Sequence, residues 1–488
     1  MHRFVFFIVA VCGGLFSCAT SKNYSPSQKI APELLRKDFT LLRSILETKH
    51  PSIYWYTSKD SMDMYFDYYH RAIADSMTEQ QFAWQVLAPM VDKIHCGHTS
   101  VGSSKAYLKW AVGKRLPSFP LYFKVWNDTM AVSANLNRKD SIFKRGTLIT
   151  SVNGVTNKGL IKRIFNYLPE DGYADNVNYV RLSGNFPYYH RNIYGLSQKY
   201  QVTYLDSSGN EAKAQLPLFV PVVDTSKKPQ REQRASQPKV NRLLRYRSLS
   251  IDSSGTMATL TLNTFSKGQL RSFFRRSFKE LRQKKVSNLV LDLRSNGGGN
   301  VATSTLLTKY ISRSPFKVAD SVYAVTRHLG PYTRYIRHGF FNNVKLLFIG
   351  KKKKDGRYHV GLLERTLYRP KRRNHFSNQV YVLTSGPTFS AAALFCNAVK
   401  GQEGITLVGE ETGGGWHGNS GIMIPDIVLP YSHNTVRLPL FRLVQYKHAP
   451  KTGSGIMPDL YIGTSYDALL KGYDYKMKVV RDLIRNNE

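Results

Sequence analysis

The chain has 488 residues and a formal net charge of +37 at pH 7, from 70 Lys and Arg against 33 Asp and Glu. Its hydrophobic content of 42% and aromatic content of 12% exclude a disordered protein, and its length predicts two to four domains. The basic stretches lack the aromatic residues of a nucleic-acid motif, so we expect no nucleic-acid partner. Such a charge suits anionic lipid head groups or acidic polypeptides, and it equally suits a surface that is only well solvated.

The N-terminus has the pattern of a secretory signal peptide, with a basic start, an apolar run over residues 4–11 and small residues after it. We expect cleavage to remove residues 1–17. The sequence Leu-Phe-Ser-Cys at this point is similar to a bacterial lipobox, which predicts a lipid on Cys18 and a tether over residues 18–31. Phe16 is bulkier than the usual residue there, so an ordinary cleaved signal is the alternative. The expected location is the bacterial cell envelope, lipid-anchored, either periplasmic or on the surface.

Residues 32–115 are expected to form a helical domain, because Leu, Ile and Phe recur there at spacings of three and four and Pro32 suits the first turn of a helix. The segment ends in a polar turn that holds His98, whose imidazole could act as a general base when it is neutral. A histidine in a turn is more often structural. Asp92 is the one carboxylate close by and the spacing fits no ligand motif, so we expect no metal and no other cofactor.

Four cysteines occur, and two of them belong to the leader. Cys96 and Cys396 are too few for a disulfide scaffold, even in an exported protein. The sequence leaves open whether these two cysteines pair.

Residues 116–220 change to a β pattern, in which alternation over 121–125 and 130–133 predicts a hairpin. A strand closed by an Asn-Gly turn follows at residues 146–154, and then an amphipathic helix over 158–167. The run Gly-Thr-Leu-Ile-Thr-Ser-Val-Asn-Gly resembles that of a PDZ domain of exported proteases, which implies capture of an extended C-terminal tail by strand addition. Any other small β-domain is the alternative. Residues 221–244, rich in Lys, Arg, Gln, Pro and Ser, are expected to form a basic linker.

Residues 245–488 are predicted to form an α/β domain. A strand over 257–262, a basic amphipathic helix over 270–284 and an apolar strand over 286–293 make a βαβ unit, which indicates a parallel sheet covered on both faces. Three glycines, Gly297–Gly299, follow the last strand, and their backbone N–H groups can approach an oxyanion closely. The loop lacks both the Lys-Ser/Thr of a P-loop and the spacing of a dinucleotide fingerprint. A sharp turn alone explains one glycine more readily than three.

The stretch from Val380 to Ala393 holds the strongest catalytic candidate. It predicts a buried strand over 380–383, a tight turn, and a helix over 391–399. Ser390 therefore lies where a strand gives way to a helix, with a hydroxyl beside the free N–H groups of the first helical turn. An acyl-transfer nucleophile needs that geometry, although a serine that only caps the helix is the alternative.

The remaining elements complete the predicted domain. The four lysines at 351–354, with Asp355 and Gly356, predict an exposed hairpin turn. After the helix that follows Ser390 we expect a strand over 405–409, a second glycine-rich loop over 410–419, strands near 428–429 and 435–438, and a C-terminal helix over 467–486.

With these pieces in order, the chain resembles the C-terminal processing (tail-specific) serine peptidases, close to the branch of the tricorn core protease. The residues that carry the resemblance are the His98 turn and the segments 146–154, 292–299, 384–393, 409–415 and 455–459. The resemblance implies an α/β multidomain fold with a helical N-terminal region, a PDZ-like β-domain and a crotonase-like α/β peptidase domain. It also implies that Ser390 is the nucleophile and that the N–H of Ala391, with that of Gly297 or Gly298, forms the oxyanion hole.

The sequence departs from the processing branch at the end of the second glycine loop. That branch has a lysine there as general base, whereas this chain has Gly415. The tricorn-like branch instead uses a histidine ahead of the PDZ region, which His98 matches, and has a serine before it where Gly97 stands. The resemblance therefore implies that His98 serves as the base in place of the lysine.

The acid that would orient the histidine remains open. The glutamate of the tricorn-like branch has no carboxylate counterpart near Thr452. Glu410 and Glu411 are the candidates for the orienting acid, and His417 is a competing base because it belongs to the loop that would line the same cleft.

The predicted function is that of an exported serine endopeptidase that cleaves polypeptides, namely the tails of damaged or unfolded envelope proteins, through an acyl-enzyme on Ser390. The fold family includes a non-peptidase relative, the interphotoreceptor retinoid-binding protein, so the first alternative is a catalytically inactive lipoprotein that binds peptides or hydrophobic ligands. The second alternative is an envelope scaffold that binds anionic lipid through its basic face.

Overall fold

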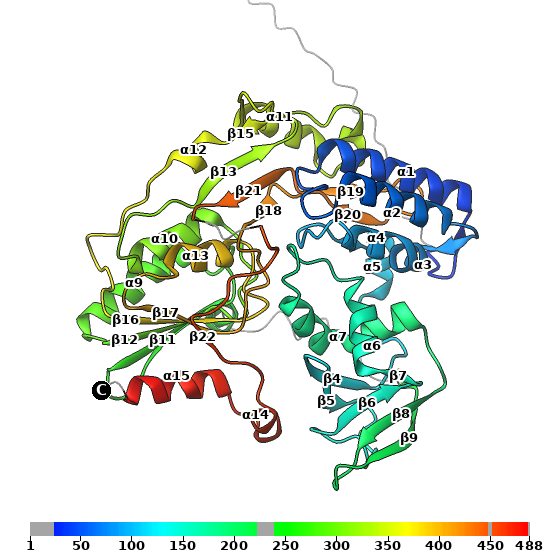
Figure 1. Cartoon of the computed structure of the whole chain (residues 1–488), viewed down its shortest axis with the longest axis horizontal. Helices are drawn as coiled ribbons and strands as arrows, with labels where there is room; N and C mark the ends of the chain where they lie inside the picture. The colour runs from blue at the N-terminus through cyan, green and yellow to red at the C-terminus, as the bar shows by residue number, and fades with distance from the viewer. Residues whose placement is uncertain (1–23, 222–238, 448–450, 487–488) are drawn as a thin grey trace, which may run out of the picture.

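The structure is a computed structural model that describes residues 24–221, 239–447 and 451–486. In Figure 1 a helical N-terminal region and a β-domain form one side of the molecule, and a larger α/β domain forms the other. Within the described ranges, no helix combines the length and the apolar character needed to pass through a bilayer. The predicted leader, the predicted lipidation site and most of the predicted linker lie outside the described residues. The α/β multidomain fold expected from the sequence is confirmed.

The N-terminal region is helical, as its spacing predicts. Its helices are α1 (Pro32–Lys49), α2 (Lys59–Arg71), α3 (Glu79–Gln81), the π-helix η1 (Phe82–Leu87), α4 (Ala88–Asp92) and α5 (Lys105–Ala111). Residues 24–31, predicted as part of the tether, are attached to this region: β1 (Lys29–Ile30) pairs with β2 (Met77–Thr78), and the Tyr24 hydroxyl donates to Glu79 at 2.9 Å. The tether was predicted because the residues after the expected cleavage site are polar. The pairing of β1 with β2 joins segments far apart in the sequence, so no local sequence pattern indicated it.

The β-domain is a sheet in the order β4-β5-β6-β8-β9, with β7 paired to β6. Its elements are β4 (Leu121–Trp126), β5 (Thr129–Asn135), β6 (Leu148–Val152), β7 (Val155–Thr156), α6 (Asn157–Phe165), α7 (Asn176–Tyr194), β8 (Lys199–Leu205) and β9 (Glu211–Pro217). The predicted hairpin and the Asn-Gly turn are both present, with positive φ at Asn127 and at Asn153. This left-handed backbone is the one that such tight hairpin turns need.

The 19-residue helix α7 has no counterpart in the sequence-based prediction. Gly184 and Pro187 lie inside it, and the helix is kinked at Asn185, where φ is −145°. These residues disfavour a helix locally. Burial of Leu182 and Phe186 against the sheet compensates, because both side chains have no exposed surface.

The α/β domain is built on a six-stranded sheet in the order β10-β11-β12-β16-β17-β22. The strands are β10 (Arg247–Ile251), β11 (Met257–Leu262), β12 (Asn288–Asp292), β16 (Gln379–Thr384), β17 (Ile405–Gly409) and β22 (Leu460–Tyr461). From β11 onward they run parallel, and β10 is an antiparallel edge strand after the short helix α8 (Lys239–Leu244). One face packs on α9 (Leu270–Gln283), α10 (Val301–Ile311) and α13 (Ala391–Val399), and the other on the C-terminal helix. The β16 strand is therefore central and covered on both faces, as its unbroken apolar run predicts.

Two smaller sheets join this domain to the helical region. One has the order β14-β15-β13-β21-β18 and comprises β14 (Lys351–Lys352), β15 (Tyr358–His359), β13 (Ala319–Ala324), β21 (Phe441–Gln445) and β18 (Gly418–Ile422). The other comprises β19 (Asp426–Val428), β20 (Thr435–Arg437) and β3 (Val101–Gly102). Because β3 follows the His98 turn and pairs with β20, the N-terminal region is fixed against the C-terminal half.

The described structure corrects one further expectation and answers one open question. The predicted C-terminal helix is two helices, α14 (Tyr466–Lys471) and α15 (Tyr475–Asn486), separated at Gly472 in the left-handed conformation. Cys96 and Cys396 are both free thiols, buried in separate hydrophobic cores. The question that the sequence left open is therefore answered: these two cysteines do not pair.

Candidate active site

Ser390 lies at the junction predicted for it, between the central strand β16 and helix α13. It has φ 52° and ψ −121°, a left-handed backbone that is strained for a residue with a side chain. Its hydroxyl caps no N–H of the helix, so the capping explanation fails. The surroundings hold this strain in place: Phe389 N–H donates to Asn296 O at 3.1 Å, and Thr388 Oγ1 donates to Leu293 O at 2.9 Å. A sharp strand-to-helix turn of this kind is typical of an exposed nucleophile.

Both glycine-rich loops pack directly beneath this turn. A Cβ built on Gly298 would lie 2.7 Å from Ser390 Cβ and 2.9 Å from Ala391 N, and one built on Gly414 would lie 3.1 Å from Ser390 N. Only glycine allows the two loops to approach so closely. The Gly298 N–H donates to Asn296 Oδ1 at 2.9 Å, so that group is already engaged. Of the two predicted glycine donors, Gly297 is therefore the better partner for Ala391 in an oxyanion hole.

His98 comes from the turn after α4 and faces the Ser390 turn. Its side chain is 5% exposed, and its ring lies 4.7 Å from that of Phe389, centroid to centroid. Among the described residues neither ring nitrogen has a hydrogen-bond partner. A Cβ on Gly97 would lie 2.7 Å from the Phe389 ring and 3.1 Å from Asp171 N, so the serine that the tricorn-like branch has here would require the Phe389 ring and the Asp171 loop to shift.

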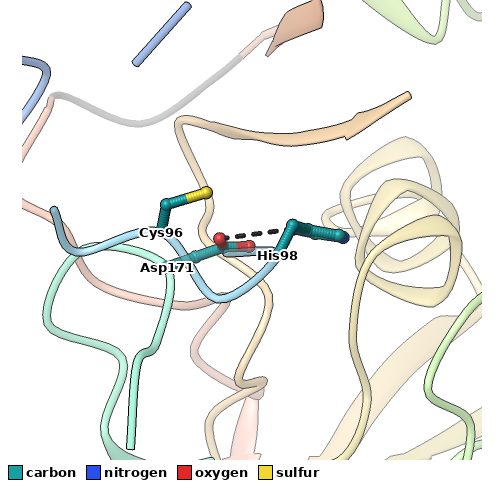
Figure 2. A group of neighbouring side chains, drawn as sticks. All are labelled: Cys96, His98 and Asp171. Carbon is teal, nitrogen blue, oxygen red and sulfur yellow. Dashed lines mark ion pairs between the residues drawn. The ribbon is translucent and has the colours of Figure 1, made fainter. Parts of the chain in front are cut away.

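Asp171 is the carboxylate beside His98, and the sequence-based prediction missed it. Asp171 Oδ1 lies 3.5 Å from His98 Nδ1, and Figure 2 marks this ion pair with a dashed line. The same oxygen accepts the Gly97 N–H at 2.9 Å. The loop that carries Asp171 is fixed to the histidine turn, because Gly172 N–H donates to His95 O at 3.0 Å. Asp171 follows the β-domain helix α6, more than seventy residues after His98. The Pro-Glu-Asp-Gly sequence at 169–172 was a turn signal with two carboxylates, but nothing local linked it to the histidine.

The serine hydroxyl and the histidine ring lie close to one common point, the position of a Cβ on Gly421. A Cβ built on Gly421, in β18, would lie 2.9 Å from His98 Nε2 and 3.0 Å from Ser390 Oγ. The sum of these two distances, about 6 Å, is the largest separation that the two reactive atoms can have, and catalytic hydrogen bonds are often loose in unliganded enzymes. Asn419 Oδ1 lies 2.8 Å from the same point and accepts the Gly421 N–H at 2.9 Å. The buried Asn419 Nδ2 has no partner among the described residues, so an amide donor is available beside the pair.

The comparisons with known proteins identify the α/β domain. Residues 256–462 match the model described as Peptidase family S41. The chain carries a peptidase domain of family S41. With this domain it is a serine-type peptidase, a hydrolase that acts on polypeptides. The match includes Ser390 but neither His98 nor Asp171, which the fold brings to the domain from outside the matched region.

Solved structures share the fold over most of the chain. The structure titled "Structure of mature CPAF complexed with lactacystin" has a TM-score of 0.61 at 16% sequence identity, and the similarity covers 93% of this chain and 99% of that one. The structure titled "Crystal Structure of mature CPAF" has a TM-score of 0.62 at 14% identity and covers 93% of this chain and 98% of that one. Among proteins of curated function the sequence finds no match. The structural likeness therefore extends the fold assignment from the S41 domain to nearly the whole chain.

The other predicted site residues of this S41 peptidase lie elsewhere. Glu410 accepts a hydrogen bond from Ser385 Oγ at 3.2 Å and forms an ion pair with Lys476 of α15. Glu411 accepts the Gly455 N–H at 2.6 Å. Both carboxylates thus hold neighbouring loops. The carboxylate paired with His98 is Asp171 of the β-domain, which the prediction did not consider because it searched the glycine loop.

Gly415 lies beside Asp171, and His417 packs on Trp55. A Cβ on Gly415 would lie 3.3 Å from Asp171 Cβ, so the place of the processing-branch lysine adjoins the carboxylate that pairs with His98. The His417 ring lies against Trp55, with ring centroids 5.6 Å apart. His417 is therefore packed on the helical region, while His98 is the ring that reaches the Ser390 turn.

The thiol of Cys96 completes a buried cluster around Asp171. Ligand atoms of Cys96, His98 and Asp171 all lie within 4.8 Å of one another, which is close enough to consider a metal ion (Figure 2). Burial, and then the nearby Asp171, raises the pKa of the Cys96 thiol to about 11. A metal ligand must be the thiolate, so this environment opposes metal binding at neutral pH.

Two residues of the helical region contact the segments on either side of the site, the His98 turn and the β18 strand. His50 Nε2 lies 2.8 Å from Thr99 Oγ1, next to His98, and Ser52 Oγ lies 2.7 Å from Ser420 Oγ, next to Gly421. The Ser52 N–H donates to His50 Nδ1 at 3.1 Å, which places the ring proton on Nε2. One short segment after α1 therefore positions the histidine turn and the β18 strand together.

Proposed function

We propose that this serine peptidase is an exported endopeptidase that cleaves the tails of damaged or unfolded envelope proteins, with Ser390 as nucleophile, His98 as base and Asp171 as the group that positions His98. The observation that carries the proposal is the meeting of Ser390 Oγ and His98 Nε2 around the Gly421 position, with a carboxylate at the far side of the imidazole. Serine peptidases on unrelated folds use that order of hydroxyl, imidazole and carboxylate.

The chemistry follows from these positions. His98 Nε2 takes the proton of the Ser390 hydroxyl as the oxygen attacks the peptide carbonyl, and Asp171 stabilises the imidazolium from the Nδ1 side. The N–H groups of Ala391 and Gly297 donate to the carbonyl oxygen as it becomes negative. The imidazolium then protonates the leaving amine. A water molecule, deprotonated by the same ring, releases the acyl group from Ser390.

The β-domain is the part that would present a polypeptide tail. The PDZ-like reading predicts that an extended tail adds to a sheet edge, and β4 is a terminal strand of this sheet with α7 packed along it. The Val125 N–H of β4 donates to Ser183 Oγ of α7 at 2.9 Å. A tail strand that pairs with β4 would replace this contact, so strand addition and a movement of α7 are coupled.

Labelling with a fluorophosphonate probe tests the catalytic assignment. The wild-type chain should react at Ser390, with loss of the probe in Ser390→Ala, and hydrolysis of an unfolded protein substrate should be lost in the same variant. Lactacystin, which the CPAF structure contains, serves as a competitor in the labelling reaction. A folded wild-type chain that is never labelled and never hydrolyses would instead support the inactive binding protein.

Two further experiments test substrate and location. Peptides that end in a free carboxylate should be cleaved faster than the same peptides with an amidated end. Ser183→Val removes the contact with the Val125 N–H that a tail has to replace, so it should lower the KM for the peptides with a free end. When cells that make the protein are grown with labelled palmitate, the label should be incorporated into the protein only when Cys18 is present. If Cys18→Ala leaves both the labelling and the membrane fraction unchanged, the lipid-anchored location is wrong.

A further inference from the structure

The helix α11 (Gly339–Ile349) turns its apolar side toward solvent. Its outward face, here called the α11 face, consists of five exposed residues: Phe340 (69%), Phe341 (64%), Val344 (40%), Leu347 (47%) and Phe348 (85%). At 100° per residue these positions form one continuous arc of about 120° on the helix surface. A helix that served only to cover the core would point this arc inward.

The side that faces the protein is the polar one. Asn343 Oδ1 accepts the Leu329 N–H at 2.6 Å and Asn343 Nδ2 donates to Thr333 Oγ1 at 2.9 Å. Asn342 Nδ2 donates to Arg337 O at 3.0 Å, and Leu346 is the buried apolar side chain of the helix. These contacts fix the rotation of α11, so the exposure of the phenylalanines is imposed by the fold.

The segment that contains the α11 face is strongly basic. Residues 327–373 contain fourteen Lys and Arg against two acids, Asp355 and Glu364. Both acids are already paired within the protein, Asp355 with His359 at 2.9 Å and Glu364 with Lys353 at 2.6 Å. The hairpin that follows α11 directly presents four exposed lysines, residues 351–354. Arg337, just before α11, is paired with Asp426 at 2.6 Å, so the positive charge that accompanies the protruding aromatic side chains comes mainly from the other lysines of the hairpin, Lys351, Lys352 and Lys354.

We infer that the α11 face and the lysine hairpin after it form a docking site for an anionic lipid surface. An apolar arc rich in Phe and Leu, flanked by Lys and Arg, is typical of a helix that lies in the membrane interface, with its apolar face among the acyl chains and its cations at the head groups. The helix is 11 residues long, far shorter than a bilayer span, so it would lie in the plane of the membrane. Figure 1 shows α11 at an outer edge of the molecule, beyond β13 and β15 and away from the β-domain, where a flat surface can reach it.

Charge decides between a membrane and a second copy of the chain. Two copies that paired their α11 faces would bring two lysine hairpins together, and like charges across an interface are costly. An anionic bilayer instead satisfies the apolar arc and the lysines at once. This docking site does not depend on the proposed substrate or on the catalytic assignment.

Vesicle flotation tests the inference with the mature chain carrying Cys18→Ala, so that no acyl chain contributes. Binding to vesicles of phosphatidylglycerol in phosphatidylcholine should weaken at least tenfold in Phe340→Ser/Phe348→Ser. The matched control is Met64→Ser/Val112→Ser, which removes two side chains of similar exposure, 66% and 73%, far from α11 and should bind as wild type. Hydrolysis of a soluble substrate by all variants reports that they are folded. In Phe348→Trp, tryptophan emission should shift to the blue on adding the anionic vesicles.

The charge requirement has its own control. Lys351→Glu/Lys352→Glu should lose binding, while Lys105→Glu/Lys109→Glu, which changes the net charge equally on α5, should retain it. Flotation that is unaffected by the phenylalanine variant, or an unshifted emission in Phe348→Trp, overturns the inference. A chain that ignores vesicles but forms a dimer that Phe340→Ser/Phe348→Ser dissociates would assign the α11 face to self-association instead.

Discussion

Replacing Gly421 by Ala places one methyl group close to both the proposed nucleophile and the proposed base. The new Cβ would lie 2.9 Å from His98 Nε2 and 3.0 Å from Ser390 Oγ, whereas the ordinary contact distance is about 3.5 Å or more. Gly421 is not among the residues with a positive φ, so alanine fits its backbone. The methyl group therefore perturbs the site through the space it occupies and not through backbone strain.

The expected loss follows from the displacement. His98 and Ser390 must each retreat by about half an ångström, which changes their separation by up to about 1 Å, and a misplacement of that size costs up to about a hundredfold in rate. We expect kcat/KM to fall about a hundredfold, which corresponds to about 3 kcal/mol of transition-state stabilisation. Stability should fall by about 1–3 kcal/mol, because three neighbouring atoms, Asn419 Oδ1 included, must shift to admit the methyl group.

The assay is kcat/KM on a fluorescent unfolded protein substrate, together with Tm and the rate of fluorophosphonate labelling. Gly361→Ala is the matched control, since a Cβ there meets only the side-chain end of Arg365, and this residue begins the short helix α12 (Gly361–Arg365), which carries none of the proposed site residues. Full activity of Gly421→Ala at an unchanged Tm would refute the reasoning, because it would show that the reacting atoms do not meet at this point.

Three further predictions concern the groups around the site. Asp171→Asn should lower kcat about a thousandfold or more, because the histidine loses the carboxylate that positions it. The control Glu411→Gln should change activity by less than about threefold. Equal losses in the two variants would exclude a special role for Asp171. Burial, and then the nearby Arg442, lowers the pKa of His50 to about 3, so the stability that the neutral ring contributes is complete above about pH 6.5 and is lost as the pH falls toward 3. Urea unfolding at pH 7 and pH 5 should therefore show a smaller acid-induced loss in His50→Gln than in wild type, and an identical loss would contradict this assignment. Hydrolysis should persist in excess EDTA, because no step uses a metal and the thiol of Cys96 stays protonated; inactivation by EDTA that zinc reverses would make the Cys96 cluster a metal site.

The sequence predicted the α/β domain well because its signals are local. The strand over 405–409 and the helix over 391–399 agree with β17 and α13 to the residue, and β16 extends the predicted strand by one residue at each end. Unbroken apolar strands and helix formers directly after a turn leave little ambiguity. The nucleophile could be placed for the same reason, since a strand, a turn and a helix meet at Ser390.

The third member of the site could not be predicted, since it depends on contacts across the chain. Asp171 and His98 lie in separate domains, and their approach depends on backbone contacts such as Gly172 to His95. The sequence offered carboxylates closer to Ser390, in Glu410 and Glu411, and these proved to hold loops and the C-terminal helix. Helix α7 was missed for a related reason, because its glycine and proline oppose a helix that tertiary burial stabilises.

The three proposed catalytic residues come from three different parts of the fold. Ser390 belongs to the α/β domain, His98 to the end of the helical region and Asp171 to the β-domain. The site is therefore complete only when all three parts are docked, and a tail that moved α7 of the β-domain could reach the loop of Asp171 directly. In such an arrangement the binding of the substrate tail and the docking of the three parts are coupled. A ligand that binds the docked form better than the undocked form shifts the population toward the docked form. The contacts of Asp171 with Gly97, rather than the strained turn at Ser390, are then the part of the site that substrate binding can tune.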